Sequence, residues 1–546
     1  MNIALAQLNY HIGNFEYNTK KIIDHINLAK AKGADLVVFA ELAVCGYPAR
    51  DFLEFDEFIE LCETAAKEIA YSCQGIACII GLPVKNDVLA GKDLYNAAYF
   101  IEDGQIRNIV KKALLPTYDV FDEYRYFEPA SHFECISFKG KKIALTICED
   151  LWNINNNPLY VSSPMDELIR QKPDLMINIA ASPFSYCHDD ERVVVLSDNA
   201  KKYKLPLLYV NQVGAQTEII FDGGSMVFDK QGKLLDEMPY FKEELRVYEM
   251  EDDQFKGYTP IEHQAAPDIE VIHEALILGI KDYFSKSGFS KAVLGLSGGI
   301  DSAIVCALAC RALGPENVMA VLMPSKYSSD HSIQDALDLV KNIGCKHEII
   351  PIKEAADAFD QMMAPAFSGL PFNLTEENIQ ARCRGIILMA MSNKFGYILL
   401  NTSNKSECAV GYGTLYGDMC GAIGVIGDVY KTQVYQLAAY INKDGIVIPE
   451  NSIIKPPSAE LRPGQKDSDS LPDYDILDKI LFQYIELKKS SSAIIAQGYD
   501  EALVRRVIKM VNTAEFKRYQ TPPILRVSPK AFGMGRRMPI VGKYLS

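Results

Sequence analysis

The stretch Leu294-Gly295-Leu296-Ser297-Gly298-Gly299-Ile300-Asp301-Ser302 decides the fold of the second half of the chain. It follows an apolar run typical of a strand and opens a run typical of a helix. Two adjacent glycines allow backbone N–H groups to approach an anion closely, and the helix start adds the positive end of its dipole. Ser297 and Ser302 offer hydroxyl donors, and Asp301 offers the oxygen ligand that Mg²⁺ prefers. The stretch therefore predicts a phosphate-binding loop between a strand and a helix.

Around this loop, strand and helix signals alternate strictly. Strands are predicted at residues 291–296, 318–323, 348–352 and 397–402, with helices between them. This order predicts a doubly wound parallel sheet whose ligand sites lie at the carboxyl ends of the strands. Further along, the sequence predicts a loop at residues 451–473 and one helical segment at 474–516.

The chain has 546 residues, enough for two domains. A polar stretch at residues 251–267, interrupted by Gly and Pro, has no clear periodicity and predicts the boundary. We therefore expect one domain at residues 1–255 and a second at 265–546. Helices, long strands and hairpins in the first half predict a layered α/β fold with a mixed sheet.

Composition narrows the class of protein. The net charge of −15 argues against nucleic-acid and acidic-membrane partners. No apolar run is long enough to span a membrane, and Met1–Tyr10 lacks the features of a secretory signal. The 13 cysteines include no CxxC pair, which favours a reducing compartment. We expect a cytoplasmic homo-oligomer that acts on small molecules.

Three ionisable residues of the first half stand beside strands or hairpins. Glu41 and Cys148 each end an apolar run, and Lys112 follows a predicted hairpin. A thiol becomes a strong nucleophile when it loses its proton, and Glu41 is suited to be the base. Lys112 is suited to stabilise the oxyanion that forms when a thiol attacks an amide. Taken singly, each residue is more often a core thiol or a solvated charge.

The segments around these residues resemble the nitrilase (carbon-nitrogen hydrolase) superfamily in order and spacing. They are Phe39-Ala40-Glu41-Leu42, Lys112-Ala113-Leu114-Leu115-Pro116 and Ile147-Cys148-Glu149-Asp150-Leu151-Trp152. The resemblance covers about residues 1–250 and implies an αββα sandwich with Glu41, Lys112 and Cys148 as the catalytic triad. Cys45 lies close to Glu41 in the sequence, but Cys148 is favoured as the nucleophile because only Cys148 matches the nucleophile segment of this superfamily.

A second segment, Asn178-Ile179-Ala180-Ala181-Ser182-Pro183-Phe184, resembles the substrate-binding stretch of this superfamily. For its glutaminase branch, the resemblance implies that Tyr118, Ser182 and His188 bind glutamine, and that Glu123 is a further active-site carboxylate. His188 stands where Lys or Arg is expected. The segment Gly214-Ala215-Gln216-Thr217-Glu218 also departs from the usual Gly-Gly-Gln-Asp-Glu.

The phosphate-binding loop resembles that of the ATP pyrophosphatases, which cleave ATP to AMP and pyrophosphate. The resemblance implies that ATP contacts Gly295, Leu296, Ser297, Gly298, Gly299, Ile300, Asp301 and Ser302. The P-loop pattern G-x-x-x-x-G-K-[ST] is absent from the sequence.

Four further segments, at residues 373–382, 401–407, 416–418 and 427–432, resemble NAD synthetases. With the first half included, the resemblance to glutamine-dependent NAD synthetases covers nearly the whole chain. It implies that ATP also contacts Thr402 and Lys431, and that deamido-NAD contacts Asn378, Glu407 and Lys517. It further implies Asp301 and Glu407 as ligands of Mg²⁺.

The reaction implied by this resemblance is deamido-NAD⁺ + ATP + L-glutamine + H₂O → NAD⁺ + AMP + diphosphate + L-glutamate. Adenylation gives the carboxylate a good leaving group, and the first domain supplies ammonia. Two alternatives remain at this point. One is an adenylating amidotransferase that acts on a purine nucleotide or a tRNA base. The other is an amidase joined to a nucleotide-binding regulatory module.

Overall fold

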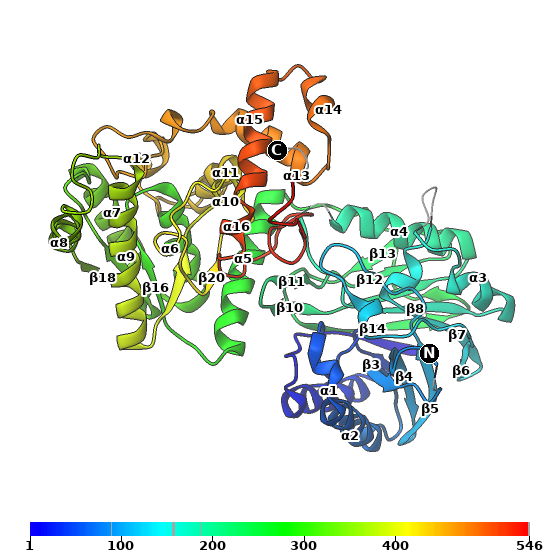
Figure 1. The fold of residues 1–546 in the computed structure, drawn as a ribbon. Coiled ribbons are helices and arrows are strands. Elements are labelled where there is room, and N and C mark those ends of the chain that lie inside the picture. Colours follow the sequence, from blue (N-terminus) through cyan, green and yellow to red (C-terminus); the bar gives the residue numbers. More distant parts are fainter. Residues whose placement is uncertain (89, 155–158, 187, 544–546) are drawn as a thin grey trace. The chain divides into compact units, whose positions relative to one another are not determined.

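The computed structural model describes residues 1–88, 90–154, 159–186 and 188–543, and of His188 it describes the backbone alone. The chain forms two compact units, Met1–Ala266 and Pro267–Ser546 (Figure 1). Among the described residues, no helix combines the length and the apolar character needed to cross a bilayer.

The first unit contains two large β-sheets and a small one. The seven-stranded sheet has the order β15-β14-β1-β2-β3-β4-β5, with bounds β1 (Asn2–Gln7), β2 (Leu36–Val38), β3 (Ala77–Lys85), β4 (Leu94–Glu102), β5 (Gln105–Lys111), β14 (Glu244–Glu251) and β15 (Gln254–Phe255). The six-stranded sheet has the order β13-β12-β9-β8-β7-β6, with bounds β6 (Ile136–Phe138), β7 (Lys141–Ile147), β8 (Leu175–Ala180), β9 (Leu207–Asn211), β12 (Met226–Phe228) and β13 (Leu234–Glu237). The small sheet pairs β10 (Val213–Gln216) with β11 (Ile219–Asp222).

The two large sheets pack face to face between two helical layers (Figure 1). α1 (Phe15–Ala31) and α2 (Asp56–Ser72) cover the seven-stranded sheet, and α3 (Pro164–Leu168) and α4 (His188–Tyr203) cover the six-stranded sheet. The strands β2, β7 and β8 are apolar along most of their length and deeply buried, as expected for strands covered on both faces. The predicted αββα sandwich is confirmed.

The second unit is built on a five-stranded parallel sheet with the order β18-β17-β16-β19-β20. Its strands are β16 (Ala292–Gly295), β17 (Val318–Leu322), β18 (Lys346–Ile349), β19 (Ile398–Asn401) and β20 (Ile423–Gly424). Chain order reverses between β16 and β19, so their carboxyl ends frame the crevice where such sheets bind ligands. The predicted doubly wound parallel sheet is confirmed.

The helices of this unit cover both faces of the sheet or form a separate C-terminal cluster. They are α5 (Asp268–Lys286), α6 (Ile300–Leu313), α7 (Asp330–Ile343), α8 (Lys353–Met363), α9 (Leu374–Phe395), α10 (Lys405–Val410), α11 (Lys431–Ile441), α12 (Glu450–Ile454), α13 (Tyr474–Ile485), α14 (Ser491–Ile495), α15 (Glu501–Thr513) and α16 (Glu515–Arg518). The single helical segment predicted at 474–516 is therefore wrong, because the chain breaks into α13, α14, α15 and α16.

Candidate active sites

Cys148 lies at a sharp turn where β7 ends and a short 3₁₀ helix, Cys148–Leu151, begins. Its φ of +44° is unusual for a residue with a side chain and is the kind of backbone strain that gathers at functional sites. Asp150 holds this turn. Its carboxylate accepts N–H bonds from Ile147 at 3.0 Å, from Ala113 at 3.0 Å and from Leu114 at 2.9 Å. The turn and the segment after Lys112 are thereby fixed to one another.

A buried cluster of charges surrounds Cys148. Lys112 Nζ donates to Glu41 Oε1 at 2.6 Å and to Glu123 Oε1 at 2.8 Å, and all three side chains are almost wholly buried. Glu41 also accepts from Asn96 Nδ2 at 2.7 Å and from the backbone N–H of Ala181 at 3.0 Å. The structure thus brings together Glu41, Lys112 and Cys148, three residues from distant parts of the sequence, and orients the Glu41 carboxylate firmly.

The electrostatics of this cluster set the resting protonation states. Burial and the neighbouring Glu41 carboxylate raise the pKa of Cys148 well above its ordinary value, so the resting thiol keeps its proton. Burial alone would lower the pKa of Lys112, but the charges of Glu123 and Glu41 outweigh burial and raise it. Burial raises the pKa of Glu123 to about 7. The cluster therefore offers a neutral thiol, a permanent cation and a carboxylate base.

A further buried carboxylate, Glu149, follows Cys148 directly, and the sequence analysis does not single it out. The Tyr118 hydroxyl donates to it at 3.0 Å and the Tyr160 hydroxyl at 3.1 Å. Burial raises the pKa of Glu149 to about 7. Ser182 lies buried just beyond β8 and donates its N–H to Asn211 Oδ1 at 2.9 Å. The side chain of His188 lies outside the described residues.

In the second unit, the loop Leu296–Gly299 joins β16 to α6. Gly298 adopts a φ of +79°, and a Cβ there would collide with the backbone carbonyl of Ser332 on α7. The hydroxyls of Ser297 and Ser302 lie 3.1 Å apart, and Ser302 Oγ accepts the Ser297 N–H at 3.2 Å. Only glycine fits the turn at position 298, and the serines hold the rest of the loop in shape.

Asp301, in the first turn of α6, contacts side chains from the segments that follow β19 and β20. Asn404 Nδ2 donates to Asp301 Oδ1 at 3.0 Å, and Lys431 Nζ forms an ion pair with Asp301 Oδ2. Burial and the charge of Asp301 raise the pKa of Glu407, and the charges of Asp301 and Glu407 raise that of Lys431 against the effect of burial. Two carboxylates and a lysine therefore share one partly buried site.

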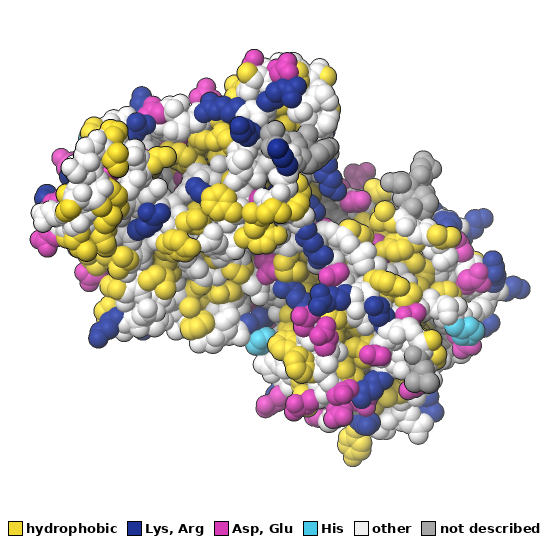
Figure 2. Space-filling model, viewed as in Figure 1, with side chains coloured by type: hydrophobic (Ala, Val, Ile, Leu, Met, Phe, Trp, Pro, Cys, Tyr) yellow, Lys and Arg dark blue, Asp and Glu magenta, His cyan; other side chains and the backbone are white. Residues whose placement is uncertain are grey.

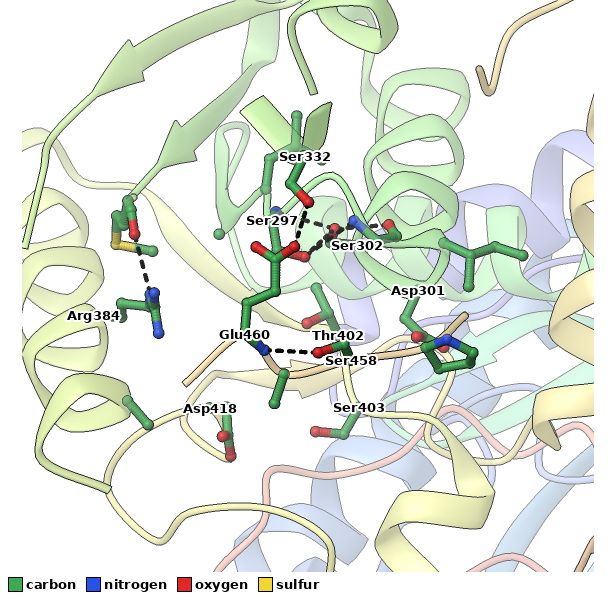
Figure 3. A pocket seen from close by; sticks show the side chains of 18 of the residues that line it. Ser297, Asp301, Ser302, Ser332, Arg384, Thr402, Ser403, Asp418, Ser458 and Glu460 are labelled. Atoms are coloured by element: carbon green, nitrogen blue, oxygen red, sulfur yellow. Dashed lines mark hydrogen bonds between the residues drawn. The ribbon is translucent and has the colours of Figure 1, made fainter. Parts of the chain in front are cut away.

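A cavity of about 310 Å³ opens at this end of the sheet (Figure 3). Seven of the eight loop residues predicted to bind ATP line it, as do Thr402, Glu407 and Lys431. Gly298 does not line it and instead makes the turn. Asn378 and Lys517 lie beside the cavity rather than on its wall. Asn378 Oδ1 accepts from Thr414 at 2.8 Å, and Lys517 Nζ donates to the carbonyls of Gly411 and Gly413.

Charged residues of the cavity wall that the sequence analysis does not single out include Arg384 and Glu460. Arg384 of α9 donates through Nε to the carbonyl of Met323 at 3.1 Å, and burial lowers its pKa. Glu460 accepts from Ser332 Oγ at 2.6 Å (Figure 3). Arg384 stands only two residues beyond the segment 373–382, so extending that segment would have found it. Glu460 comes from the stretch predicted as a loop and has no local signal.

Known proteins resemble this chain over its full length. A curated glutamine-dependent NAD(+) synthetase from Synechocystis sp. is 47% identical over 547 residues, which cover 98% of each chain. The chain belongs to the glutamine-dependent NAD(+) synthetase family. A second member, from Acinetobacter baylyi, is 42% identical and covers 99% of this chain and 98% of its own. Two family models match this family's halves, Carbon-nitrogen hydrolase at residues 2–255 and NAD synthase at residues 272–521.

Solved members of the glutamine-dependent NAD(+) synthetase family share the fold. The enzyme from Acinetobacter baumannii, solved in complex with ADP, is 39% identical with a TM-score of 0.79 and covers 100% of this chain and 99% of its own. A synthetase from Cytophaga hutchinsonii has a TM-score of 0.83 over 100% of this chain and 98% of its own at 22% identity, a likeness of fold alone.

Proposed function

We propose that this protein is a ligase that catalyses deamido-NAD⁺ + ATP + L-glutamine + H₂O → NAD⁺ + AMP + diphosphate + L-glutamate. The observation that carries the proposal is the pair of sites on one chain. One is the buried cluster of Glu41, Lys112 and Cys148. The other is the loop Leu296–Gly299 beside Asp301 and Lys431. We assign nitrogen release to residues 1–255 and ligation to residues 265–546.

Glutamine hydrolysis begins at Cys148. Its sulfur attacks the side-chain amide carbon of glutamine while Glu41 takes the thiol proton. The oxyanion that forms lies near Lys112, which stays protonated because Glu123 and Glu41 raise its pKa. The C–N bond then breaks, and Glu41 returns the proton to the leaving nitrogen as ammonia. Water, activated by Glu41, hydrolyses the remaining thioester and releases glutamate.

Glutamine is held by Tyr118, Ser182 and His188 in this proposal, with Glu149 added from the structure. Glu149 lies next to the nucleophile, and the Tyr118 hydroxyl orients its carboxylate. A buried carboxylate is suited to pair with the α-ammonium group of an amino acid. Neutral imidazole at His188 would contribute less to binding the α-carboxylate than a lysine would.

We expect glutamine binding to weaken as the pH falls below about 7. The pKa of Glu149 is raised by burial to about 7, so this carboxylate loses its charge below that pH, and the α-ammonium loses its partner. The KM for glutamine should rise by about tenfold for each further pH unit. In Glu149→Gln the KM should be high and should no longer rise as the pH falls.

Steady-state kinetics of glutamate release across this pH range test the role of Glu149. Because Glu123 also has a pKa of about 7 and belongs to the catalytic cluster, its titration should appear in kcat rather than in KM. A wild-type KM that stays constant through this range would remove Glu149 from the glutamine site.

In the second site, the carboxylate of deamido-NAD attacks the α-phosphorus of ATP. The bond to the bridging oxygen breaks, diphosphate leaves, and an acyl adenylate remains. Ammonia adds to the acyl carbon, a proton is lost to solvent, and AMP departs. The loop Gly295–Ser302 with Thr402 and Lys431 would contact ATP, and the lysine stays protonated beside its two carboxylates.

The donor set of this site fits Mg²⁺. Asp301 and Glu407 supply carboxylate oxygens, and burial and the charge of Asp301 raise the pKa of Glu407, a penalty that a bound cation would relieve. When bound there, Mg²⁺ would neutralise phosphate charge. Asn378, Glu407 and Lys517 would contact deamido-NAD. Asn378 and Lys517 come from α9 and α16, and each bonds to the segment Gly411–Thr414 that follows α10.

The activity is tested with the purified chain, deamido-NAD, ATP, Mg²⁺ and glutamine. We expect NAD⁺, AMP and diphosphate in equal amounts. Amidation of another nucleotide, and not of deamido-NAD, would favour the rival amidotransferase. Glutamate release without diphosphate would favour an amidase joined to a regulatory module.

We also propose a homo-oligomer in the cytoplasm. Large apolar side chains are exposed on α9 and just before it, including Phe372, Leu374, Ile386 and Phe395, and Figure 2 shows apolar side chains gathered on this part of the second unit. A second copy is suited to cover them. Light scattering should give at least twice the chain mass, and a monomeric mass at working concentrations would contradict this. The proposed cytoplasmic location rests on the cysteines. Twelve described cysteines are free of disulfides, which favours a reducing compartment.

A further inference from the structure

Three cysteines of the second unit meet in a buried cluster that the proposed reaction does not use. Cys306 and Cys310 stand one turn apart on α6, and Cys345 follows the end of α7. Their sulfur atoms all lie within 4.8 Å of one another, and Cys306 Sγ lies 3.9 Å from Cys345 Sγ. Cys306 is fully buried, and Cys310 and Cys345 are each 6% exposed.

The spacing of the sulfurs matches a shared metal ion better than a disulfide. Three sulfurs at about 2.3 Å from one ion lie about 3.8 Å apart in a tetrahedral and about 4.0 Å apart in a trigonal arrangement. A disulfide requires about 2.05 Å, so one thiol would have to move by almost 2 Å. A disulfide would also leave the third thiol without a role.

We propose that Cys306, Cys310 and Cys345 form a three-thiolate site for a thiophilic d¹⁰ metal ion, Zn²⁺ or Cu⁺. Thiolate sulfur is the ligand type that selects these ions. Binding of a divalent ion follows M²⁺ + 3 R–SH → [M(SR)₃]⁻ + 3 H⁺, with the protons released to solvent.

A metal ion bound by this cluster would affect the part of the structure that holds the phosphate loop. Cys306 lies one turn after Ser302, whose hydroxyl holds the phosphate loop. Cys345 follows α7, whose Ser332 packs against Gly298 of the same loop. A metal ion would therefore tie together the two helices that hold this loop, and we expect it to raise the thermal midpoint of the protein.

The site is tested by titrating the full-length chain with Cd²⁺, whose thiolate complexes absorb in the near ultraviolet. Cys148→Ala serves as the background, and excess Mg²⁺ occupies carboxylate sites. We expect the background protein to bind one equivalent of Cd²⁺ and to release protons as it does so. In Cys345→Ala the affinity for Cd²⁺ should fall more than about 100-fold, a larger loss than substitutions of residues outside the ligand set cause. Cys78→Ala is the matched control, since Cys78 is a buried thiol 3.2 Å from the sulfur of Cys73 but forms no three-ligand group among the described residues. That control should bind as the background does.

Competition by Zn²⁺ or Cu⁺, and elemental analysis of protein purified without chelators, distinguish the two ions. If Cys345→Ala does not fold, Cys310→Ala gives the same comparison, and the thermal midpoint of each metal-free variant reports folding. Absence of the Cd²⁺ band in the background protein, or an unchanged band in the cysteine variants, would overturn the proposal. Oxidation by diamide that joins Cys306 to Cys345 in a protein without metal affinity would also overturn it.

Discussion

Replacing Cys148 by alanine should lower glutamine-dependent NAD⁺ synthesis by about four orders of magnitude or more, because no other group forms the thioester. Synthesis with high ammonium chloride should persist, because the ligase site needs only dissolved ammonia. The buried side chain loses one sulfur atom, so the free energy of unfolding should fall by only about 1 kcal/mol. Both nitrogen sources are measured on one preparation, which separates loss of the nucleophile from misfolding.

The matched control for this substitution is Cys45→Ala. Cys45 is also buried and stands near Glu41 in sequence, but its sulfur donates to the carbonyls of Leu42 and Gly46 and hydrogen-bonds with Cys62. This variant should keep glutamine-dependent synthesis within a few-fold of wild type. If Cys148→Ala still uses glutamine well and Cys45→Ala does not, the nucleophile has been assigned to the wrong cysteine.

Asp301→Asn should lower NAD⁺ synthesis with either nitrogen source by about 100- to 1000-fold. The substitution keeps the shape of the side chain but removes the charge that pairs with Lys431 and that would hold Mg²⁺. Glutamate release at Cys148 should continue, because that chemistry needs no group of the phosphate loop. Diphosphate and glutamate are measured in parallel.

Asp330→Asn is the matched control for Asp301→Asn. It also removes a carboxylate from the first turn of a helix, α7, but Asp330 is exposed and does not line the cavity. We expect no loss of synthesis there. Normal ammonia-dependent turnover in Asp301→Asn would exclude Asp301 from the metal and phosphate chemistry.

Local sequence patterns were enough to predict the elements that carry both sites. Cys148 follows a mostly apolar run, and the loop before Asp301 joins a strand pattern to a helix pattern, so both positions follow from neighbours in the chain. Local signals also mark where the last helices begin. Ser490 and Asp500 accept the N–H groups of Ala493 and Leu503, and these N-cap signals would have divided the segment 474–516 correctly.

Contacts between distant segments could not be predicted in this way. Glu149 gains its significance from Tyr118, which lies 31 residues away. Glu460 reaches Ser332 across 128 residues. The strand predicted at 348–352 begins two residues and ends three residues after β18. All residues of β18 are exposed, so hydrophobicity does not mark the positions that pair. The three-cysteine cluster also escapes sequence analysis, since Cys345 meets α6 only in the folded chain.

The central claim is that nitrogen released from glutamine at Cys148 becomes the amide nitrogen of NAD⁺. The most direct test supplies deamido-NAD, ATP, Mg²⁺ and glutamine labelled with nitrogen-15 in the side-chain amide, together with a small amount of unlabelled ammonium. Mass spectrometry then reads the NAD⁺ product. We predict NAD⁺ that is one mass unit heavier in the wild-type chain and unlabelled NAD⁺, made from ammonium, in Cys148→Ala. Unlabelled NAD⁺ from the wild-type chain, or no NAD⁺ at all, would contradict the account.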